Sequence, residues 1–167
     1  MVTIDDVRRL REETGAGVMD AKRALEEAGG DFNKARNLLR EKGMEAAAKR
    51  SDRATSQGTV EAYIHSGGRI GALVEINCET DFVARTDAFR TLARDIAMQV
   101  AAMDPLGLLP EDVPADAAGT PRERALLTQA FIKDGSRNIE QMIQDVIAQT
   151  GENIRVTRFS RFELGRS

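Results

Sequence analysis

The sequence has 167 residues, 41% hydrophobic and 31% charged, a length that accommodates one ordinary domain and a small second one. No apolar run approaches the roughly 18 residues of a membrane span, and the first residues form an acidic helical pattern instead of a signal sequence. Its 24 basic and 27 acidic residues are well mixed, so nucleic-acid binding is not expected. The single cysteine, Cys78, has no partner for a disulfide or a thiolate metal site, and we expect a cytoplasmic protein.

The N-terminal third of the chain has the pattern of three short helices. Apolar residues recur at helical spacing, and glycines follow each repeat. Asp31 can cap the third helix, and Gly43 is expected to end it. Helices this short are marginal alone, so they must pack together. We predict a three-helix partner-docking domain over residues 1–50, followed by a polar linker over residues 51–57.

From Gly58 the hydrophobic period becomes two, which is typical of strands. A glycine-rich turn separates two such segments, and a third lies near the C-terminus. If Ile64 and Ile70 share a face, the turn must have an odd number of residues, three or five, with one glycine at positive φ. In the third segment Arg158 and Ser160 interrupt the apolar parity, which predicts a β-bulge there.

Helical spacing returns at Thr86, a plausible N-cap, and continues to Met103. A surface connection then follows, because all four prolines fall in one window, at Pro105, Pro110, Pro114 and Pro121. Thr120 begins a capping box, and we expect the helix that it starts to reach Phe131. A last apolar stripe is closed by Gly151.

These elements predict an α+β protein in which helices pack on one face of a three-stranded antiparallel sheet. The sheet and its helices are expected to form the core and dimerisation domain, residues 58–167. The other face of the sheet must either face solvent or be covered. Leu73, Tyr63 and Phe159 have the parity expected to point away from the helices, toward that face. We therefore expect a homodimer in which these side chains meet a second copy.

The sequence offers little support for bond-making chemistry. His65 has no second histidine or cysteine to complete a metal site, and an ordinary strand histidine is the better interpretation. Gly67 and Gly68 lack the lysine and hydroxyl residue of a phosphate-binding loop. We find no pair of carboxylates whose environments would give the two groups different pKa values, as acid–base catalysis requires. We expect neither an enzyme, nor a cofactor, nor a bound metal.

The segment Asn77–Val83 lies where a strand gives way to a helix. Asp81 and Phe82 fall between the two periodicities, and neither periodicity assigns Phe82 to the core. An exposed phenylalanine is useful when a partner receives it, whereas most aromatics are interior. Phe82 is therefore either a contact residue or a cap that folds back on the core.

The loop Thr14–Met19 is the second candidate for contact. Its glycines are explained by a turn between two helices, where positive φ is needed. Met19 can pack inward in such a turn or remain exposed. The residues alone leave both arrangements open.

Three blocks of the chain occur in the order found in one known family: Leu10–Lys22, Thr80–Val83, and Gly151–Ile154 continuing to Arg161–Gly165. The chain resembles translation elongation factor Ts, the guanine-nucleotide exchange factor of elongation factor Tu. The resemblance covers nearly all residues outside roughly 104–135.

The resemblance implies that the three helices form a ubiquitin-associated-like domain and that Arg11, Val18 and Met19 contact GDP-bound elongation factor Tu. It also implies that Thr80, Asp81, Phe82 and Val83 form the exchange element, with Phe82 as its wedge. Long members carry a second core copy, which this chain lacks, so a second chain is expected to supply the missing half.

A binding module from another class is the alternative. In that interpretation the three helices form an adaptor for ubiquitin-like or other helical partners, and the sheet serves only dimerisation. The small, glycine-rich loop after the first helix is unlike the larger hydrophobic loop that a ubiquitin binder normally offers.

Overall fold

A computed structural model describes residues 2–166 of the chain, which form two compact units. The first unit comprises residues up to Arg53 together with Gln144–Asn153, and the second comprises Ala54–Ile143 together with residues from Ile154 onward. No helix among the described residues is long and apolar enough to cross a membrane. Whether residues 1–50 fold as a separate domain stays a prediction.

The first unit contains α1 (Ile4–Thr14), α2 (Val18–Glu27), α3 (Phe32–Arg50) and the C-terminal half of α7 (Ile139–Thr150). Its first three helices enclose a small core, and the guanidinium of Arg9 stacks over the ring of Phe32, which flanks this core. The fully buried members of this core are Leu10, Ala21, Ala24, Leu25 and Ala35.

The third helix begins as predicted and ends later than predicted. The Asp31 carboxylate accepts hydrogen bonds from the backbone N–H groups of Asn33 and Lys34, as an N-cap does. Gly43, however, lies inside α3, which continues to Arg50. A Cβ atom at Gly43 would lie 3.8 Å from the Cβ of Ala148 on α7, so two small residues lie at the contact between these helices. That packing offsets the roughly 1 kcal/mol that glycine costs inside a helix.

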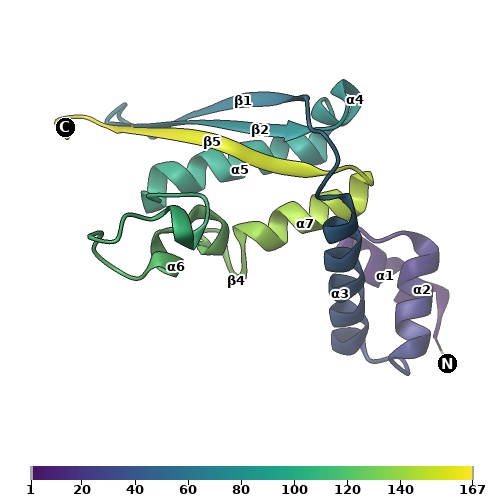
Figure 1. The fold of residues 1–167 in the computed structure, drawn as a ribbon. Helices are drawn as coiled ribbons and strands as arrows, with labels where there is room; N and C mark the ends of the chain where they lie inside the picture. The colour runs from purple at the N-terminus through teal and green to yellow at the C-terminus, as the bar shows by residue number, and fades with distance from the viewer. Residues whose placement is uncertain (1, 167) are drawn as a thin grey trace. The chain divides into compact units, whose positions relative to one another are not determined.

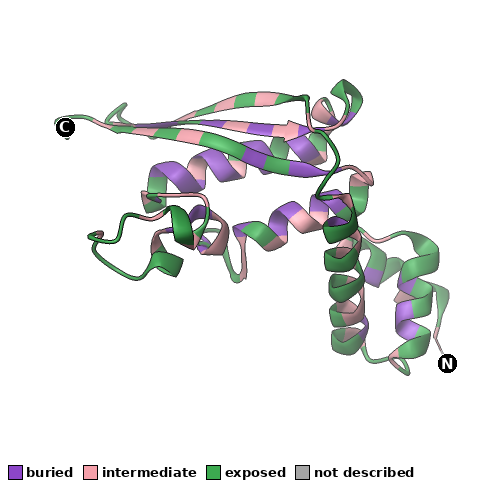
Figure 2. Ribbon diagram, viewed as in Figure 1, coloured by how far each residue is buried: buried purple, intermediate pink, exposed green. Residues whose placement is uncertain are grey.

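The second unit is an antiparallel sheet of β1 (Gln57–Ile64), β2 (Ile70–Cys78) and β5 (Ile154–Glu163), in the order β1-β2-β5. The long helix α5 (Asp87–Met103) lies along one face of this sheet, and the short α4 (Asp81–Ala84) lies at one end of the sheet (Figure 1). The predicted α+β architecture is therefore confirmed. Burial alternates along β2, whose residues toward α5 are buried: Ala72, Val74, Ile76 and Cys78 (Figure 2).

The turn between β1 and β2 has an even number of residues, so the predicted odd loop is wrong. Ile64 pairs with Gly71, and the N–H of His65 donates to the carbonyl of Ile70 over 2.8 Å. Both central glycines have positive φ, 90° at Gly67 and 68° at Gly68. Two adjacent residues at positive φ favour a register centred between them, and this register overrides the apolar parity of β1.

The register of the hairpin reverses the face predicted for β1, and the bulge in the pairing of β2 with β5 reverses the face predicted for the C-terminal part of β5. Directly paired residues share a face. Tyr63 pairs with Ala72 and Phe159 pairs with Val74, so both aromatics point toward α5 and their predicted outward orientation is wrong. Only Leu73 points outward as predicted. The predicted bulge is present, since the pairing of β2 with β5 shifts between Glu75 and Ile76.

The face opposite α5 consequently carries a group of exposed apolar side chains, which we call the outer sheet face. Its apolar members come from all three strands and the residue that follows β5: Val60, Ala62, Ile64, Leu73, Phe162 and Leu164.

Residues 104–138 form a compact connection of short elements. These are η1 (Pro110–Asp112), α6 (Pro121–Arg124), η2 (Leu126–Thr128), β3 (Ala130–Phe131) and β4 (Asp134–Asn138). The capping box at Thr120 is present, but the helix predicted to reach Phe131 ends after one turn. Ala125 instead forms a bridge with Gly107, and Leu126 is fully buried. These tertiary contacts override local helix propensity.

Candidate partner-binding site

The side chain of Phe82 is largely exposed, with 78% of its surface accessible. It lies on α4, which follows the end of β2 after two residues. The next residue, Val83, is 6% exposed and anchors the short helix in the core. The arrangement in which Phe82 folds back as a cap on the core is therefore excluded. A protruding ring on an anchored helix is suited to enter a partner surface.

Hydrogen bonds from two threonines hold α4 at both ends. The Thr80 hydroxyl accepts from the N–H of Val83 over 3.3 Å and caps the helix. The Thr86 hydroxyl donates to the carbonyl of Val83 over 2.7 Å. The Cys78 thiol donates to the Thr80 carbonyl over 3.1 Å, which gives the buried cysteine a second structural role. The exchange element predicted from the sequence is thus one locally ordered structure.

Asp81 is paired within the same helix. Its carboxylate lies 3.0 Å from a guanidinium nitrogen of Arg85, four residues later, and both side chains are largely exposed. An exposed pair of this kind contributes about 0–1 kcal/mol, so it does little for stability. It fixes the direction of the Asp81 side chain beside Phe82 and leaves the carboxylate accessible.

The loop between α1 and α2 presents the second set of predicted residues. Gly15 adopts the left-handed conformation at φ 69°, and its N–H donates to the carbonyl of Arg11. Val18 and Met19 begin α2 with exposed side chains, and Met19 is 61% accessible. Met19 therefore does not pack inward. The structure leaves Arg11, Val18 and Met19 available for contact.

An ion-pair group supports the same end of α1. The carboxylate of Glu13 lies 2.6 Å from the guanidinium of Arg36 and 3.1 Å from that of Arg9. Hydrogen bonds from Arg36 and then Arg9 hold the pKa of Glu13 below its usual range. This glutamate stays ionised well below neutral pH. It links α1 to α3 at the end of α1 that carries the loop.

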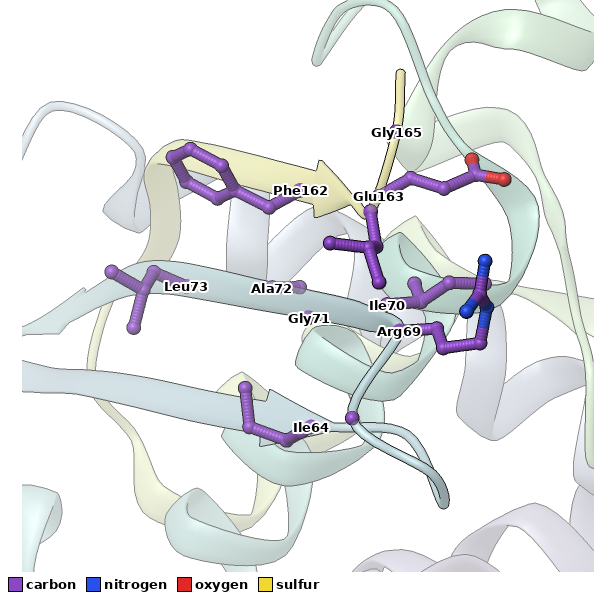
Figure 3. Close-up of a pocket in the computed structure, with 11 residues that line it drawn as sticks. Ile64, Arg69, Ile70, Gly71, Ala72, Leu73, Phe162, Glu163 and Gly165 are labelled. Atoms are coloured by element: carbon purple, nitrogen blue, oxygen red, sulfur yellow. The ribbon is translucent and has the colours of Figure 1, made fainter.

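An open apolar depression lies on the outer sheet face of the second unit. Ile64, Leu73 and Phe162 extend into it from three neighbouring strands (Figure 3). Gly71 opens it, because a Cβ there would lie 2.7 Å from the Cδ1 of Ile64. Sequence reasoning missed Ile64 and Phe162 as surface residues, although their apolar character was visible, because it assigned their strands the wrong register.

Among residues 2–166 no cluster of three histidine, cysteine or acidic residues could hold a metal ion. The one histidine, His65, is exposed, and its Nδ1 lies 3.1 Å from the Tyr63 hydroxyl. The candidate sites consist of exposed apolar side chains with an accessible carboxylate beside one of them. Such surfaces define a protein that acts by binding a macromolecular partner.

Comparison with known proteins gives the family. A sequence model of the family described as Elongation factor TS matches residues 20–123. Proteins named Elongation factor Ts are similar over nearly the whole chain. That of Desulfosudis oleivorans is 45% identical over 95% of this chain and 96% of its own length. Those of Syntrophomonas wolfei and Carboxydothermus hydrogenoformans are 47% and 49% identical over 99% of this chain, and over 91% and 90% of their own lengths.

The chain belongs to the elongation factor Ts family. The aligned length with the Syntrophomonas wolfei protein is 195 residues, more than the 167 of this chain, so that relative carries residues for which this chain has no counterpart.

Proposed function

We propose that α4 is the element by which this protein releases GDP from elongation factor Tu. As a member of its family, the protein is a guanine-nucleotide exchange factor for elongation factor Tu in translation elongation, and the adaptor alternative is not favoured. It promotes exchange and makes or breaks no covalent bond. The observation that carries the proposal is the exposed ring of Phe82 on a capped and anchored helix.

In this proposal the partner is the GDP-bound form, and Phe82 inserts as a wedge into its nucleotide-binding domain. Thr80 and Val83 hold the wedge in place, and Asp81 adds a polar contact beside it. Complete burial of a phenylalanine side chain contributes about 1.5–3 kcal/mol. This free energy is gained only in the complex, so it is available to stabilise a partner conformation that holds nucleotide weakly.

Thermodynamic linkage sets how much is needed. Each 1.4 kcal/mol by which the factor favours the nucleotide-weakened conformation lowers nucleotide affinity about tenfold, and bound nucleotide weakens the factor by the same ratio. The burial of one aromatic ring therefore accounts for about one to two factors of ten. Additional contacts must supply the rest.

A separate role, that of strengthening the complex, we assign to the exposed loop of the first unit, with Arg11, Val18 and Met19 as docking residues. A docking contact strengthens the complex without changing the nucleotide site, so its loss raises the half-saturating concentration and leaves the maximal rate unchanged. Met19→Asp is expected to have this effect. Ile4→Asp is the control, because Ile4 is an exposed apolar residue of α1 outside the loop.

We further propose that the protein is a homodimer through its outer sheet face. Val60, Ile64, Leu73, Phe162 and Leu164 are large apolar side chains exposed on one side of the sheet. A group of exposed apolar side chains on one face suits the centre of an interface. Because β1, β2 and β5 all contribute, a second copy can cover the whole sheet, which is the scale of a stable interface of about 1,200–2,000 Å² in total.

The function is tested by release of fluorescent GDP from purified elongation factor Tu. The protein is expected to accelerate release at substoichiometric concentration, since an exchange factor turns over. An adaptor would bind without acceleration. Release at the spontaneous rate, with binding intact, would contradict the exchange function.

A further inference from the structure

The orientation of the wedge must be fixed by something outside α4. A helix of four residues is far below the length at which helices are stable alone. The ion pair between Asp81 and Arg85 is exposed and joins only the first residue of α4 to its C-cap. Val83 anchors the helix in the core, and the Cys78 thiol bonds to the Thr80 carbonyl on the N-terminal side of α4. On the C-terminal side, the backbone N–H of Thr86 donates to the Val83 carbonyl over 3.0 Å. A side-chain link on that side would add a second tie between α4 and the core.

Thr86 supplies such a link. Its hydroxyl donates to the carbonyl of Val83 over 2.7 Å and accepts from the N–H of Phe89 over 3.3 Å. A hydroxyl has one donor and can accept as well, so one oxygen joins α4 to the first turn of α5. Phe89 is fully buried, and α5 contacts all three strands of the sheet. The link therefore ends in the buried core of the second unit.

We propose that Thr86 is a positioning residue for nucleotide exchange, which holds α4 against α5 so that Phe82 is presented in a single orientation. The inference rests on the proposed role of Phe82. If the link is lost, only a fraction of the molecules present the ring correctly. Because the complex also forms through the docking residues of the first unit, binding is retained, and the maximal rate falls in proportion to that fraction.

The test compares Thr86→Val, which keeps the shape and removes the hydroxyl, with Thr86→Ser, which keeps the hydroxyl. Thr120→Val is the matched control, because Thr120 is likewise a helix N-cap in this unit, that of α6, and has no hydrogen bond to α4. Thr86→Val is expected to lower the maximal exchange rate about tenfold with the half-saturating concentration changed less than twofold. The serine variant and the control should keep the rate of the unmodified protein.

A double-mutant comparison separates positioning from general stability. Since Thr86 acts through Phe82, adding Thr86→Val to Phe82→Ala should cause no further loss. A further tenfold loss in that background would overturn the inference. So would an unchanged rate for Thr86→Val while Phe82→Ala is slow. If the Phe82→Ala variant promotes exchange at the full rate, the proposed role of Phe82 is wrong, and so is the proposed function of α4.

A measurement without the partner adds a direct readout. The chain has no tryptophan, so Phe82→Trp introduces a single fluorescent reporter on α4. Time-resolved anisotropy of this reporter should show faster local motion with Thr86→Val and unchanged motion with Thr86→Ser. Circular dichroism checks that each variant is folded at the assay temperature, and Thr86→Ala replaces the valine variant if valine prevents folding. Equal local motion in the hydroxyl-containing and hydroxyl-free proteins would overturn the inference.

Discussion

Phe82 has the position of a contact residue in the sequence and is exposed in the structure. Neither the strand period before it nor the helix period after it includes this position, and the structure leaves its ring in solvent. The fold needs only Val83 from this pair of neighbours. An exposed aromatic that the core does not use can be changed at little cost to folding, which makes its role in exchange testable by substitution.

Phe82→Ala is expected to lower stimulated GDP release at least tenfold while the melting temperature stays within 2 °C of the original, because about 1.5–3 kcal/mol of burial is lost only in the complex. Asp81→Ala should act in the same direction more weakly, since it removes a polar contact and keeps the ring. Stopped-flow release of fluorescent GDP and thermal melts provide the measurements. A melting temperature that falls in parallel with activity would show that the ring supports the fold instead.

At the scale of elements, the sequence was sufficient for the type of most helices and strands. Thr86 and Asp31 were recognised as N-caps, and Gly151 as the end of the last helix, because each signal is local. The predictions that were wrong depend on contacts between residues that are far apart in the sequence. The end of the helix that starts at Thr120 depends on a bridge from Ala125 to Gly107, and no periodicity in the segment itself contains that information.

The prediction of which side chains lie on the outer sheet face was wrong for a related reason. The parity of apolar residues in β1 suggested that Ile64 was interior, but two adjacent glycines set the hairpin register and turned the strand over. Wherever a period-two pattern is present, a change of one residue in the turn exchanges the two faces. Short motifs were enough to single out Phe82 and Met19 as candidate contact residues, and both are exposed, whereas the sheet surface could not be predicted in this way.

Gly58 provides a stability prediction for the pairing of β1 and β2. It has φ 145°, and a Cβ there would lie 2.1 Å from the carbonyl oxygen of Ile76. Gly58→Ala must therefore shift one backbone against another, and it is expected to lower the free energy of unfolding by about 2 kcal/mol or more. Gly135→Ala is the control, since no heavy atom lies within 4 Å of a Cβ at that position. Urea denaturation compares the two, and equal midpoints would contradict this account.

At the scale of the molecule, ion pairs join the C-terminal end of β5 to the end of α5. Hydrogen bonds from Arg161 and Arg166 hold the pKa of Glu163 below its usual range, and Arg161 and Arg166 also pair with Asp104 at the end of α5. A carboxylate whose folded-state pKa is depressed stabilises the protein above its unfolded pKa and loses this contribution as the pH falls through the folded value.

Glu163→Gln is therefore expected to lower the melting temperature at pH 7. The difference from the original protein should shrink below pH 4 and vanish once Glu163 is protonated in both states. Differential scanning calorimetry between pH 7 and pH 3 measures this. Arg158→Gln, which breaks an exposed pair with Glu75 elsewhere on the sheet, serves as the comparison. A difference that stays constant over this range would show that the glutamate acts through packing alone.

The outer sheet face sets the expectation for assembly. Phe162 is 71% exposed, and with Ile64 and Leu73 it borders an apolar depression that water would have to cover in a monomer (Figure 3). Burying these side chains against a second copy removes that contact with water, whereas an aspartate at Leu73 would leave a charge without a partner in the interface. Leu73→Asp is therefore expected to convert a dimer to a monomer with weaker exchange activity. Light scattering at micromolar concentration measures the mass, with Ile4→Asp as an exposed control outside this face, and a monomer mass for the unmodified protein would refute the dimer.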